Sequence, residues 1–277
     1  VAYVAPIAEE NGRVNTGMKF QMEQEFSALD AQAIAKAAVE RALTGLTAQQ
    51  PASATCAIAF ENRAAASLLG VFSSIFSAEA AQKGLSLLKG REGEAIASEA
   101  VTIVDDPHRP HSAASKPFDG EGVPTRKKNV VEKGVLQTLL HNLTTAAKQG
   151  VATTGNAARG YASAVGVAPS NFYIAPSQES VEAMLARMGE GFLITEVSGL
   201  HAGANQISGD FSLLAKGFAV RGGQKAEPVE QITVAGNFFA VLKDIVAVAD
   251  DLAFGLPGGS LVGSPTIWVK ALSVAGK

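Results

Sequence analysis

The stretch GFLITEVSGLHAGANQISGDFSLLAKGFAVRGGQKAEPVEQITVAG, residues 191–236, decides the fold. Its β-branched and aromatic residues predict three strands. These are Phe192–Val197, Asp210–Arg221 and Val229–Val234. The apolar parity of the second strand shifts near Lys216–Gly217, which indicates a β-bulge, and Gly222–Gly223 predicts the turn into the third strand. The stretch therefore predicts a hairpin-rich β core.

A polar, glycine-rich loop, Ser198–Gly209, joins the first two of these strands. Loops on rigid sheets carry most binding sites, and glycines let a second backbone approach closely. A sheet edge beside such a loop could pair with an extended peptide through main-chain hydrogen bonds. We therefore expect the loop to line a peptide-binding groove, with side-chain contacts from His201, Asn205, Gln206 and Asp210. The alternative is a hairpin loop packed on its own domain or on a dimer partner.

The composition is that of a soluble globular protein, with 277 residues, 47% of them hydrophobic and 18% charged. This length is enough for one large or two ordinary domains. The formal net charge of −3 gives no reason to expect direct nucleic-acid binding. The one dense basic run, Arg126–Lys128, is better explained as a solvated turn than as a nucleic-acid patch.

Cysteine content and hydropathy lead us to expect a cytoplasmic protein that does not enter membranes. Cys56 is the single cysteine, lies in the apolar run Ala54–Phe60 and cannot form a disulfide within the chain. The sequence contains neither a long uninterrupted apolar stretch nor an N-terminal signal sequence. Because the chain starts at Val1 inside an apparent strand, we expect it to be a fragment of a longer protein.

The first 50 residues are interpreted as the end of an N-terminal domain. Asn11–Gly12 predicts a hairpin between two strand-like runs, Val1–Ile7 and Val14–Met22. Asp30 is expected to cap a helix over Ala31–Leu46. The following segment is polar and carries a proline, as linkers do. We therefore divide the chain into residues 1–50 and a C-terminal domain over residues 51–277.

The C-terminal domain is predicted to surround a buried helix. Ala64–Phe76 is apolar almost all round, so it is expected at the centre of the domain. Further helices are predicted at Ala78–Leu88, Thr144–Gln149, Ser180–Met188 and Phe238–Val248, a loop over residues 250–263, and a last strand at Thr266–Val274. Strands and helices segregate along the chain, which predicts an α+β fold with a mostly antiparallel, barrel-like sheet.

Histidines and carboxylates offer two weak candidate sites. His108 and His111 could bind a metal ion together with Asp105 or Asp106, although prolines separate the histidines from any shared helical face, and a solvated loop is the favoured interpretation. His141 follows an apolar run and is interpreted as a hydrogen-bonded residue at a strand end.

The second candidate is a pair of carboxylates in one loop. Asp119 and Glu121 could act as an acid and a base, but a turn whose carboxylates accept backbone N–H groups is the favoured interpretation. The spacing of the polar residues does not indicate a catalytic nucleophile together with a base and a residue that orients the base. Residues alone therefore indicate an α+β protein with a polar groove and no assigned chemistry.

Four segments, in this order and spacing, resemble the C-terminal domain of the TldD/PmbA family. They are Pro117–Val123, Thr153–Ala157, Ser208–Ser212 with Gly217–Phe218, and Ile232–Asn237. The resemblance covers about Cys56–Lys277, and Val1–Leu46 resembles the last hairpin and linking helix of that family's N-terminal domain. It implies a cytosolic, dimer-forming peptidase system, described in older terms as a modulator of DNA gyrase.

The TldD branch of this family resembles a zinc metalloprotease with a His-Glu-x-x-x-His helix and a cysteine ligand near the C-terminus. Here the expected strand-to-helix junction reads Asn62–Ser67, none of the four histidines precedes a glutamate, and residues 254–263 hold no cysteine. The chain therefore resembles the PmbA (TldE) branch. We expect no catalytic residues, no bound metal and no cofactor.

The resemblance leaves two main functions open. The first is a non-catalytic subunit that works with a TldD-type subunit on unfolded peptides. The second is a standalone homodimer with a binding or regulatory role and no peptidase activity. A third, less favoured, is a peptidase that uses other residues. Whether the chain is an enzyme is therefore undecided by its sequence.

Overall fold

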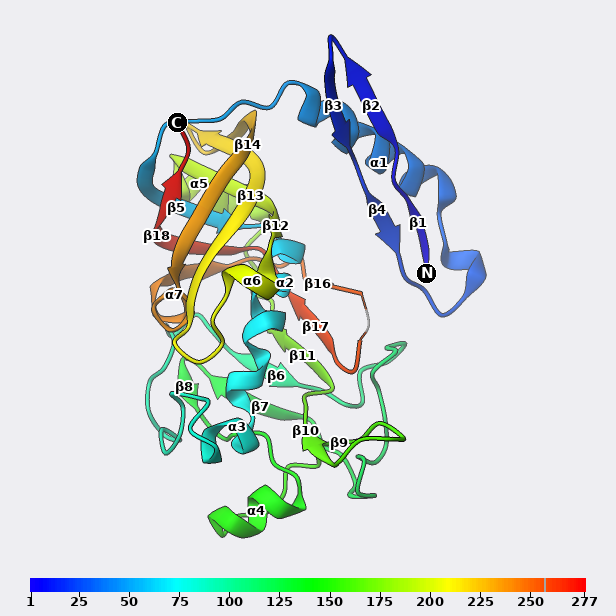
Figure 1. Cartoon of the computed structure of the whole chain (residues 1–277), viewed down its shortest axis with the longest axis vertical. Helices are drawn as coiled ribbons and strands as arrows, with labels where there is room; N and C mark the ends of the chain where they lie inside the picture. Colours follow the sequence, from blue (N-terminus) through cyan, green and yellow to red (C-terminus); the bar gives the residue numbers. More distant parts are fainter. Residues whose placement is uncertain (257) are drawn as a thin grey trace.

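The computed structural model describes residues 1–256 and 258–277. Figure 1 shows three parts: an N-terminal hairpin with its helix, a β-barrel, and a second sheet below the barrel. The barrel is built from the stretch that opened the sequence analysis. Its strands are β5 (Ala54–Phe60), β12 (Gly191–Ser198), β13 (Asp210–Arg221), β14 (Gln224–Asn237) and β18 (Ile267–Ala275).

The barrel closes because its first and last strands pair with each other. The order is β14-β13-β12-β5-β18, and β14 pairs in turn with β18. Within the barrel only β12 and β5 run parallel. The ladder between β13 and β14 shifts between Ala215 and Gly217, where the sequence predicted a bulge. The predicted α+β, mostly antiparallel and barrel-like fold is confirmed.

The second sheet has the order β16-β17-β11-β6-β7-β8. Its strands are β6 (Ile103–Asp105), β7 (Lys128–Glu132), β8 (Val135–Leu136), β11 (Asn171–Ile174), β16 (Ala253–Phe254) and β17 (Leu261–Ser264). The prediction of a loop over residues 250–263 is wrong at β16 and β17, and Pro257 lies outside the described residues. These short strands exist because β17 pairs with the distant β11, a contact that local sequence does not reveal.

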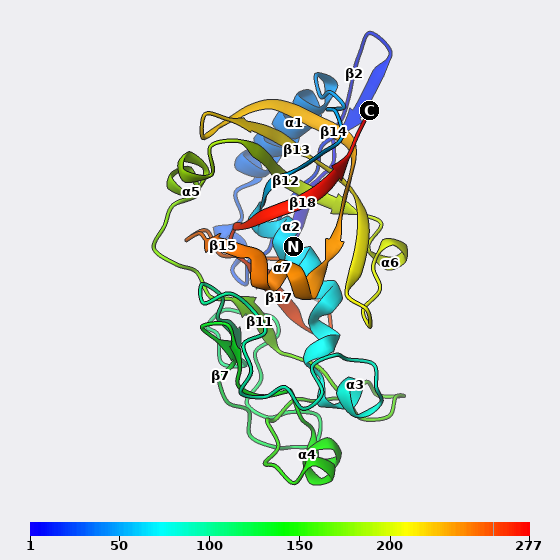
Figure 2. The same cartoon turned by 90° about the vertical axis from the view of Figure 1, so that its left-hand side faces the viewer.

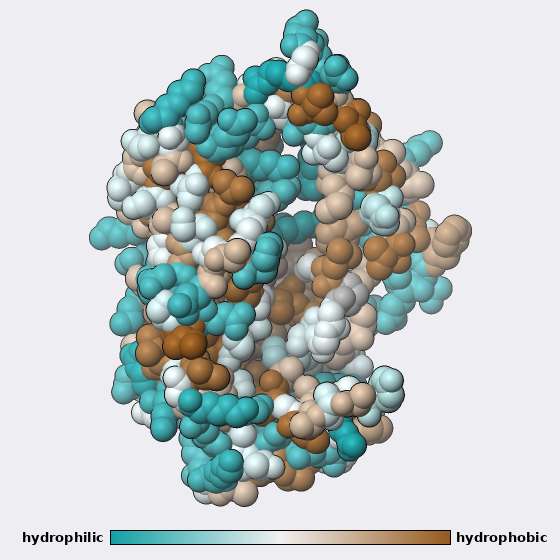
Figure 3. Space-filling view, in the orientation of Figure 1, coloured by the Kyte–Doolittle hydropathy of each residue, from teal (hydrophilic) through white to brown (hydrophobic). Residues whose placement is uncertain are grey.

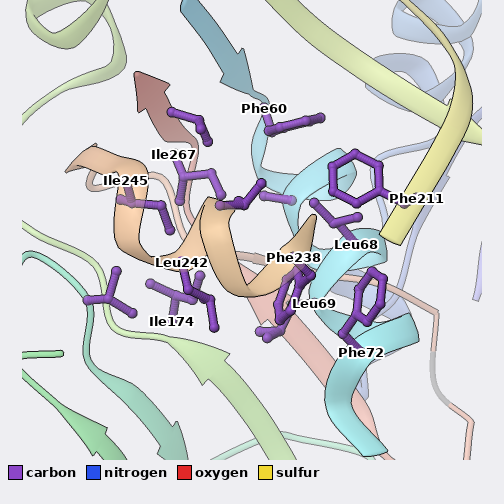
Figure 4. Close-up of a cluster of buried hydrophobic side chains, with 14 of the residues drawn as sticks. Phe60, Leu68, Leu69, Phe72, Ile174, Phe211, Phe238, Leu242, Ile245 and Ile267 are labelled. Carbon is purple, nitrogen blue, oxygen red and sulfur yellow. The ribbon is translucent and has the colours of Figure 1, made fainter. Parts of the chain in front are cut away.

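A buried helix joins the barrel to the second sheet (Figure 2). It is α2 (Asn62–Phe72), followed by a 3-10 turn over Ser73–Phe76 where the sequence predicted continuous helix. Leu69 and Phe72 are buried among apolar side chains from both neighbouring parts (Figure 4). The Phe72 ring stacks on Phe238 with 4.4 Å between centroids. The predicted buried central helix is thus present, although shorter than expected.

The N-terminal part forms the predicted hairpin and helix, although each arm of the hairpin is two short strands rather than one. The hairpin pairs β1 (Ala2–Val4) with β4 (Lys19–Gln21) and β2 (Ile7–Glu10) with β3 (Arg13–Thr16). Asn11 and Gly12 both have positive φ, as a two-residue type I′ turn requires. Helix α1 spans Ala31–Leu46, and the Asp30 carboxylate accepts the N–H of Ala33 at 2.9 Å.

Two further predicted helices are also longer than the helices in the structure. The helix predicted over Ala78–Leu88 is present as α3, which ends at Gln82 (Ala78–Gln82). The helix predicted over Phe238–Val248 is present as α7 (Phe238–Asp244). The rest of that segment is strand β15 (Ile245–Val248), which pairs with β18. Residues in β15 alternate between buried and exposed over Ile245–Ala247, which suits a strand once a partner is available.

The remaining elements are short. They are the 3-10 turn Phe26–Ala28, α4 (Leu143–Gln149), α5 (Val181–Met188), α6 (Leu200–Gly203) and the pair β9 (Ala157–Ala158) and β10 (Gly166–Val167). Among the described residues, no helix is long and apolar enough to cross a membrane.

Candidate functional site

The loop between β12 and β13 folds back on itself beside the barrel. Its first half forms the short helix α6, where the sequence predicted irregular loop. Its second half is closed by Asn205, whose side-chain oxygen accepts the N–H groups of Ile207 and Ser208 at 2.9 and 3.2 Å. The Asn205 N–H donates to the Asp210 carbonyl at 2.8 Å. The loop is therefore a built structure rather than a flexible connection.

An open groove of about 1110 Å³ lies between this loop, β13 and α2. All four sequence-predicted residues line it: His201, Asn205, Gln206 and Asp210. Val71 of α2 and Leu200 give the groove an apolar part. The structure thus brings the predicted residues to one surface, where α6 contacts both α2 and β13 (Figure 1).

Three of the four side chains already have partners inside the protein. Asn205 holds the loop, and the Gln206 amide oxygen accepts the Ser74 hydroxyl at 3.0 Å. The Asp210 carboxylate accepts the Asn237 amide at 2.9 Å, and hydrogen bonds from Asn237 and then Ser208 lower its pKa. Over residues 1–256 and 258–277, the exposed His201 side chain makes no hydrogen bond. His201 is therefore the side chain in this groove most available to a ligand.

The expected free sheet edge does not lie at this loop. Strand β13 pairs with β14 along its whole length, and its C-terminal part, Leu214–Val220, pairs with β12. The part of β13 before Leu214 is covered by α6. Gly203 lies so close to it that a Cβ there would be 2.3 Å from the Ser212 carbonyl oxygen. Pairing with β12 and β14 and coverage by α6 therefore leave β13 without the free edge that the sequence argument assumed.

An unpaired edge lies instead on β12. Strand β5 pairs with β12 only through Phe192–Ile194, because β5 ends at Phe60 and the chain enters α2. In the part of the chain that the structure describes, Thr195–Ser198 of β12 has no strand partner on that side. Sequence reasoning missed this edge because it depends on where a distant strand stops.

The junction between β5 and α2 does not suit a zinc ion. Asn62 donates its amide to the Asp251 carboxylate at 3.0 Å, and the Ser67 hydroxyl donates to the Arg63 carbonyl. The guanidinium of Arg63 adds a positive charge beside them. Neutral amide and hydroxyl groups are poor zinc ligands compared with imidazole and thiolate. No group of three potential metal ligands occurs among the described residues.

The histidine and aspartate loop is structural. The Asp105 carboxylate is completely buried and accepts hydrogen bonds from Lys128, Asn156 and Ser170 at 2.6 to 2.8 Å. His108 Nε2 lies 3.0 Å from the Thr125 hydroxyl. The Asp105 carboxylate is therefore fully engaged by hydrogen-bond donors. The described residues do not provide a set of metal ligands around His108 and His111.

The basic run Arg126–Lys128 is held within the same region. Lys127 pairs with Asp106 at 3.1 Å and Lys128 with Asp105 at 2.8 Å. The Lys128 side chain is only 9% exposed and begins β7, so the interpretation as a solvated turn is wrong at this residue.

The favoured interpretation of Asp119, a turn in which its carboxylate accepts backbone N–H groups, is confirmed. One Asp119 carboxylate oxygen accepts the N–H groups of Glu121 and Val123, and the other accepts that of Ala157, all between 2.9 and 3.0 Å. Glu121 accepts the N–H of Leu143 at 2.8 Å. These carboxylates serve the backbone.

Two other residues differ from their predicted environments. The backbone N–H of His141 donates to the Thr154 hydroxyl, but its buried Nδ1 has no hydrogen-bond partner among the described residues, and burial lowers its pKa. Cys56 is half-buried rather than fully buried, and burial raises the pKa of its thiol.

Comparison with known proteins shows which family has this architecture. Residues 53–276 match the family described as the PmbA/TldA metallopeptidase C-terminal domain. The metalloprotease PmbA of Escherichia coli O157:H7 is 31% identical over 247 residues, which cover 89% of this chain and 52% of that protein. The chain thus spans about half the length of this curated relative.

Two solved structures agree with this assignment. A candidate modulator of a DNA gyrase from Thermotoga maritima is 40% identical with a TM-score of 0.90, over 99% of this chain and 61% of that one. TldE from Thermococcus kodakarensis is 25% identical with a TM-score of 0.89, over 99% and 62% of the two chains.

Proposed function

The chain belongs to the PmbA/TldD metallopeptidase family, and we propose that it is a non-catalytic, PmbA-like subunit that holds peptide for a TldD-type metalloprotease partner. One observation carries the proposal. The junction of β5 and α2 has amide, hydroxyl and guanidinium groups in place of zinc ligands, while the surrounding barrel and central helix are intact. Among the described residues, the family scaffold is thus present while this junction carries no imidazole or thiolate ligands for zinc.

Peptide holding is supported by two features. The unpaired stretch Thr195–Ser198 of β12 can accept an extended peptide as an added strand. Separately, the groove beside α6 offers His201 and the apolar Val71 to the side chains of a peptide. Main-chain pairing depends little on side-chain identity, so such a site tolerates many unfolded sequences.

Reconstitution tests the subunit role. The chain and a TldD-type subunit from the same organism are purified separately, and cleavage of an unfolded peptide is measured for each protein and for the mixture. We expect co-elution of the two proteins and higher cleavage in the mixture, with no cleavage by this chain alone. Cleavage by this chain alone that survives repurification would show that it is itself the peptidase.

A His201→Ala variant tests the groove. We expect a raised KM for peptide in the reconstituted pair, with assembly unchanged, because His201 makes no side-chain hydrogen bond within the described residues. His111→Ala is the matched control, since His111 is an exposed histidine in a distant loop. Equal KM values for both variants and the unaltered chain would mean that the groove holds no substrate.

The second candidate function is a standalone regulatory homodimer, favoured by the Thermotoga relative that is described as a candidate modulator of a DNA gyrase. Light scattering separates the two. A homodimer that persists in the presence of the TldD-type protein would support the regulatory role over the subunit role.

A further inference from the structure

A second cleft, of about 470 Å³, separates the N-terminal part from the barrel. Helix α1 and strand β3 form one wall, and β12, β13 and β14 form the other. Figure 3 shows the molecule hollowed between these two parts. Thr195 and Glu196, which begin the unpaired stretch of β12, line the cleft. The width of the cleft therefore affects what can reach that stretch.

The linker between α1 and β5, residues 47–53, closes one end of the cleft. The Gln49 N–H donates to the Pro228 carbonyl at 3.0 Å, and the Glu230 N–H donates to the Gln49 carbonyl at 3.1 Å. The linker thus pairs with the free edge of β14 as a short added strand. Arg13 of the hairpin reinforces this end, because its guanidinium donates to the Glu230 carboxylate at 2.9 Å.

The linker is seated on a β-bulge. Glu230 and Gln231 of β14 lie opposite one residue of β13, Lys216. Gln231 has a φ of 54°, a left-handed conformation that residues other than glycine rarely adopt and that persists only when the surroundings hold it. Its carbonyl accepts the side-chain amide of Gln50 at 2.8 Å. This end of the cleft is therefore firmly joined to the barrel.

The other end of the N-terminal part is held by one contact with α2. The Arg63 guanidinium lies 4.0 Å from the centroid of the Phe20 ring on β4 and donates to the Phe20 carbonyl at 3.3 Å. In Figure 1 the linker leaves the upper end of α1, whereas β4 ends at the lower end of the hairpin. Among the described residues, hydrogen bonds join the hairpin and α1 to the C-terminal domain only here and at the linker end.

The hairpin and α1 are packed together too closely to slide past each other. A Cβ on Gly17 would lie 2.1 Å from the Ala38 carbonyl oxygen. The Asn15 amide donates to the Ala42 carbonyl at 2.9 Å. Because close-packed elements transmit displacement, the N-terminal part should move as one body.

We propose that the N-terminal part is a gate over the cleft, which swings about the linker and is held closed by the stacking of Arg63 on Phe20. A single, partly exposed cation–π contact is weak, whereas the linker end is held by several backbone hydrogen bonds. Release therefore occurs at α2 and widens the cleft beside Thr195 and Glu196. The gate itself does not depend on the proposed subunit role, and only its use for peptide entry rests on that role.

Distances between paired spin labels on the full chain, measured by pulsed electron paramagnetic resonance, test the gate. Labels on Gln32→Cys, at the start of α1, and Glu182→Cys, on α5 beside the barrel, report the free end. Labels on Leu43→Cys and Glu182→Cys report the linker end. Cys56→Ser removes the native thiol. We expect Phe20→Ala to add a displaced population to the first pair and to leave the second nearly unchanged.

Arg63→Gln removes the same contact from the other side, so it should also raise the displaced population, by about twofold or more. The matched control is Lys216→Gln. This change removes a cation that lines the same cleft, but its partner Glu196 belongs to the barrel, at 3.0 Å. The control should leave both distance distributions unchanged.

Unchanged distances for the first pair in both Phe20→Ala and Arg63→Gln would overturn the gate, as would an equal change in Lys216→Gln. Equal displacement of both label pairs would overturn the assignment of the linker as the hinge. Should Phe20→Ala fail to fold, the comparison of Arg63→Gln with Lys216→Gln still decides. No peptidase or partner enters this test, so its outcome is separate from that of the reconstitution.

Discussion

Glu61 shows how one half-buried carboxylate couples pH to the stability of the fold. Burial raises its pKa above the reference value of 4.5, and the nearby cations Arg41, Lys225 and Arg63 only partly offset this. The folded protein therefore binds this proton more tightly than the unfolded chain does. Stability then falls as the pH rises from about the unfolded pKa through the higher folded pKa, and the full destabilisation is present above both.

The expected consequence is that Glu61→Gln raises the free energy of unfolding at pH 7 to 8 and loses this advantage below pH about 4. Urea denaturation at a series of pH values measures the difference. Glu99→Gln removes an exposed carboxylate that has no ion pair in the described chain and should show no such pH dependence. Parallel curves for the two variants would contradict the assignment of Glu61.

Residue roles were predictable where they depend on neighbours in sequence. Asp30 caps the helix that follows it, and Asp119 closes its own turn, because both accept N–H groups a few residues away. Asp105 could not be interpreted in this way. Its partners Asn156 and Ser170 come from segments 51 and 65 residues later, and only the fold brings them together.

At the scale of elements, α2 is the support of the C-terminal domain. Leu69 is 1% exposed and belongs to the apolar cluster shared by the barrel and the second sheet. Leu69→Ala should therefore lower the free energy of unfolding by about 2–5 kcal/mol. Leu43→Ala, on the exposed side of α1 at 53% exposure, is the control and should change it by less than about 0.5 kcal/mol. Denaturant titration of both variants makes the comparison, and equal losses would place α2 at the periphery.

The barrel bulge makes a second prediction. A side chain on Gly217 would place its Cβ 2.0 Å from the Leu193 carbonyl oxygen, so Gly217→Ala should destabilise the protein by about 1–3 kcal/mol or more. Gly70 of α2 has no atom closer than 3.9 Å to the same position. Gly70→Ala should stabilise the helix by about 0.5–1 kcal/mol. Thermal unfolding of the two variants should shift in opposite directions, and shifts of the same sign would contradict the close approach at Gly217.

Element boundaries could be predicted from sequence where capping decides them, and not where a distant partner does. Helix α1 has its predicted ends because Asp30 and the apolar pattern are local signals. Strand β15 was predicted as helix because its pairing with β18 is invisible along the chain. The candidate site divides similarly. Its four loop residues were predicted together, whereas the covered edge of β13 depends on α6 and the unpaired stretch of β12 depends on where β5 ends.

For the whole molecule, the donor chemistry predicts that the purified chain holds no stoichiometric zinc. Asn62 and Ser67 cannot replace imidazole and thiolate, and Arg63 adds a positive charge at the junction. Elemental analysis of protein prepared without chelators should find well under one zinc per chain. The same measurement after incubation with zinc and desalting is the control for loss during purification. One tightly held zinc per chain in either sample would contradict the prediction.

The three parts of the molecule should differ in stability. One apolar cluster joins α2, the barrel and the second sheet, whereas the buried face of α1 lies outside it. The contacts between the N-terminal part and the barrel include polar ones, such as the Arg13–Glu230 ion pair, exposed enough to contribute little. A hairpin with a single helix is marginally stable by itself.

Backbone amides of the N-terminal part should therefore exchange with solvent deuterium faster than those of the barrel, through local opening that leaves the rest folded. Hydrogen-exchange mass spectrometry of the full chain measures this, and α1 and α2 provide a comparison of two helices within one sample. Equal protection of both helices would show that the chain unfolds as one unit.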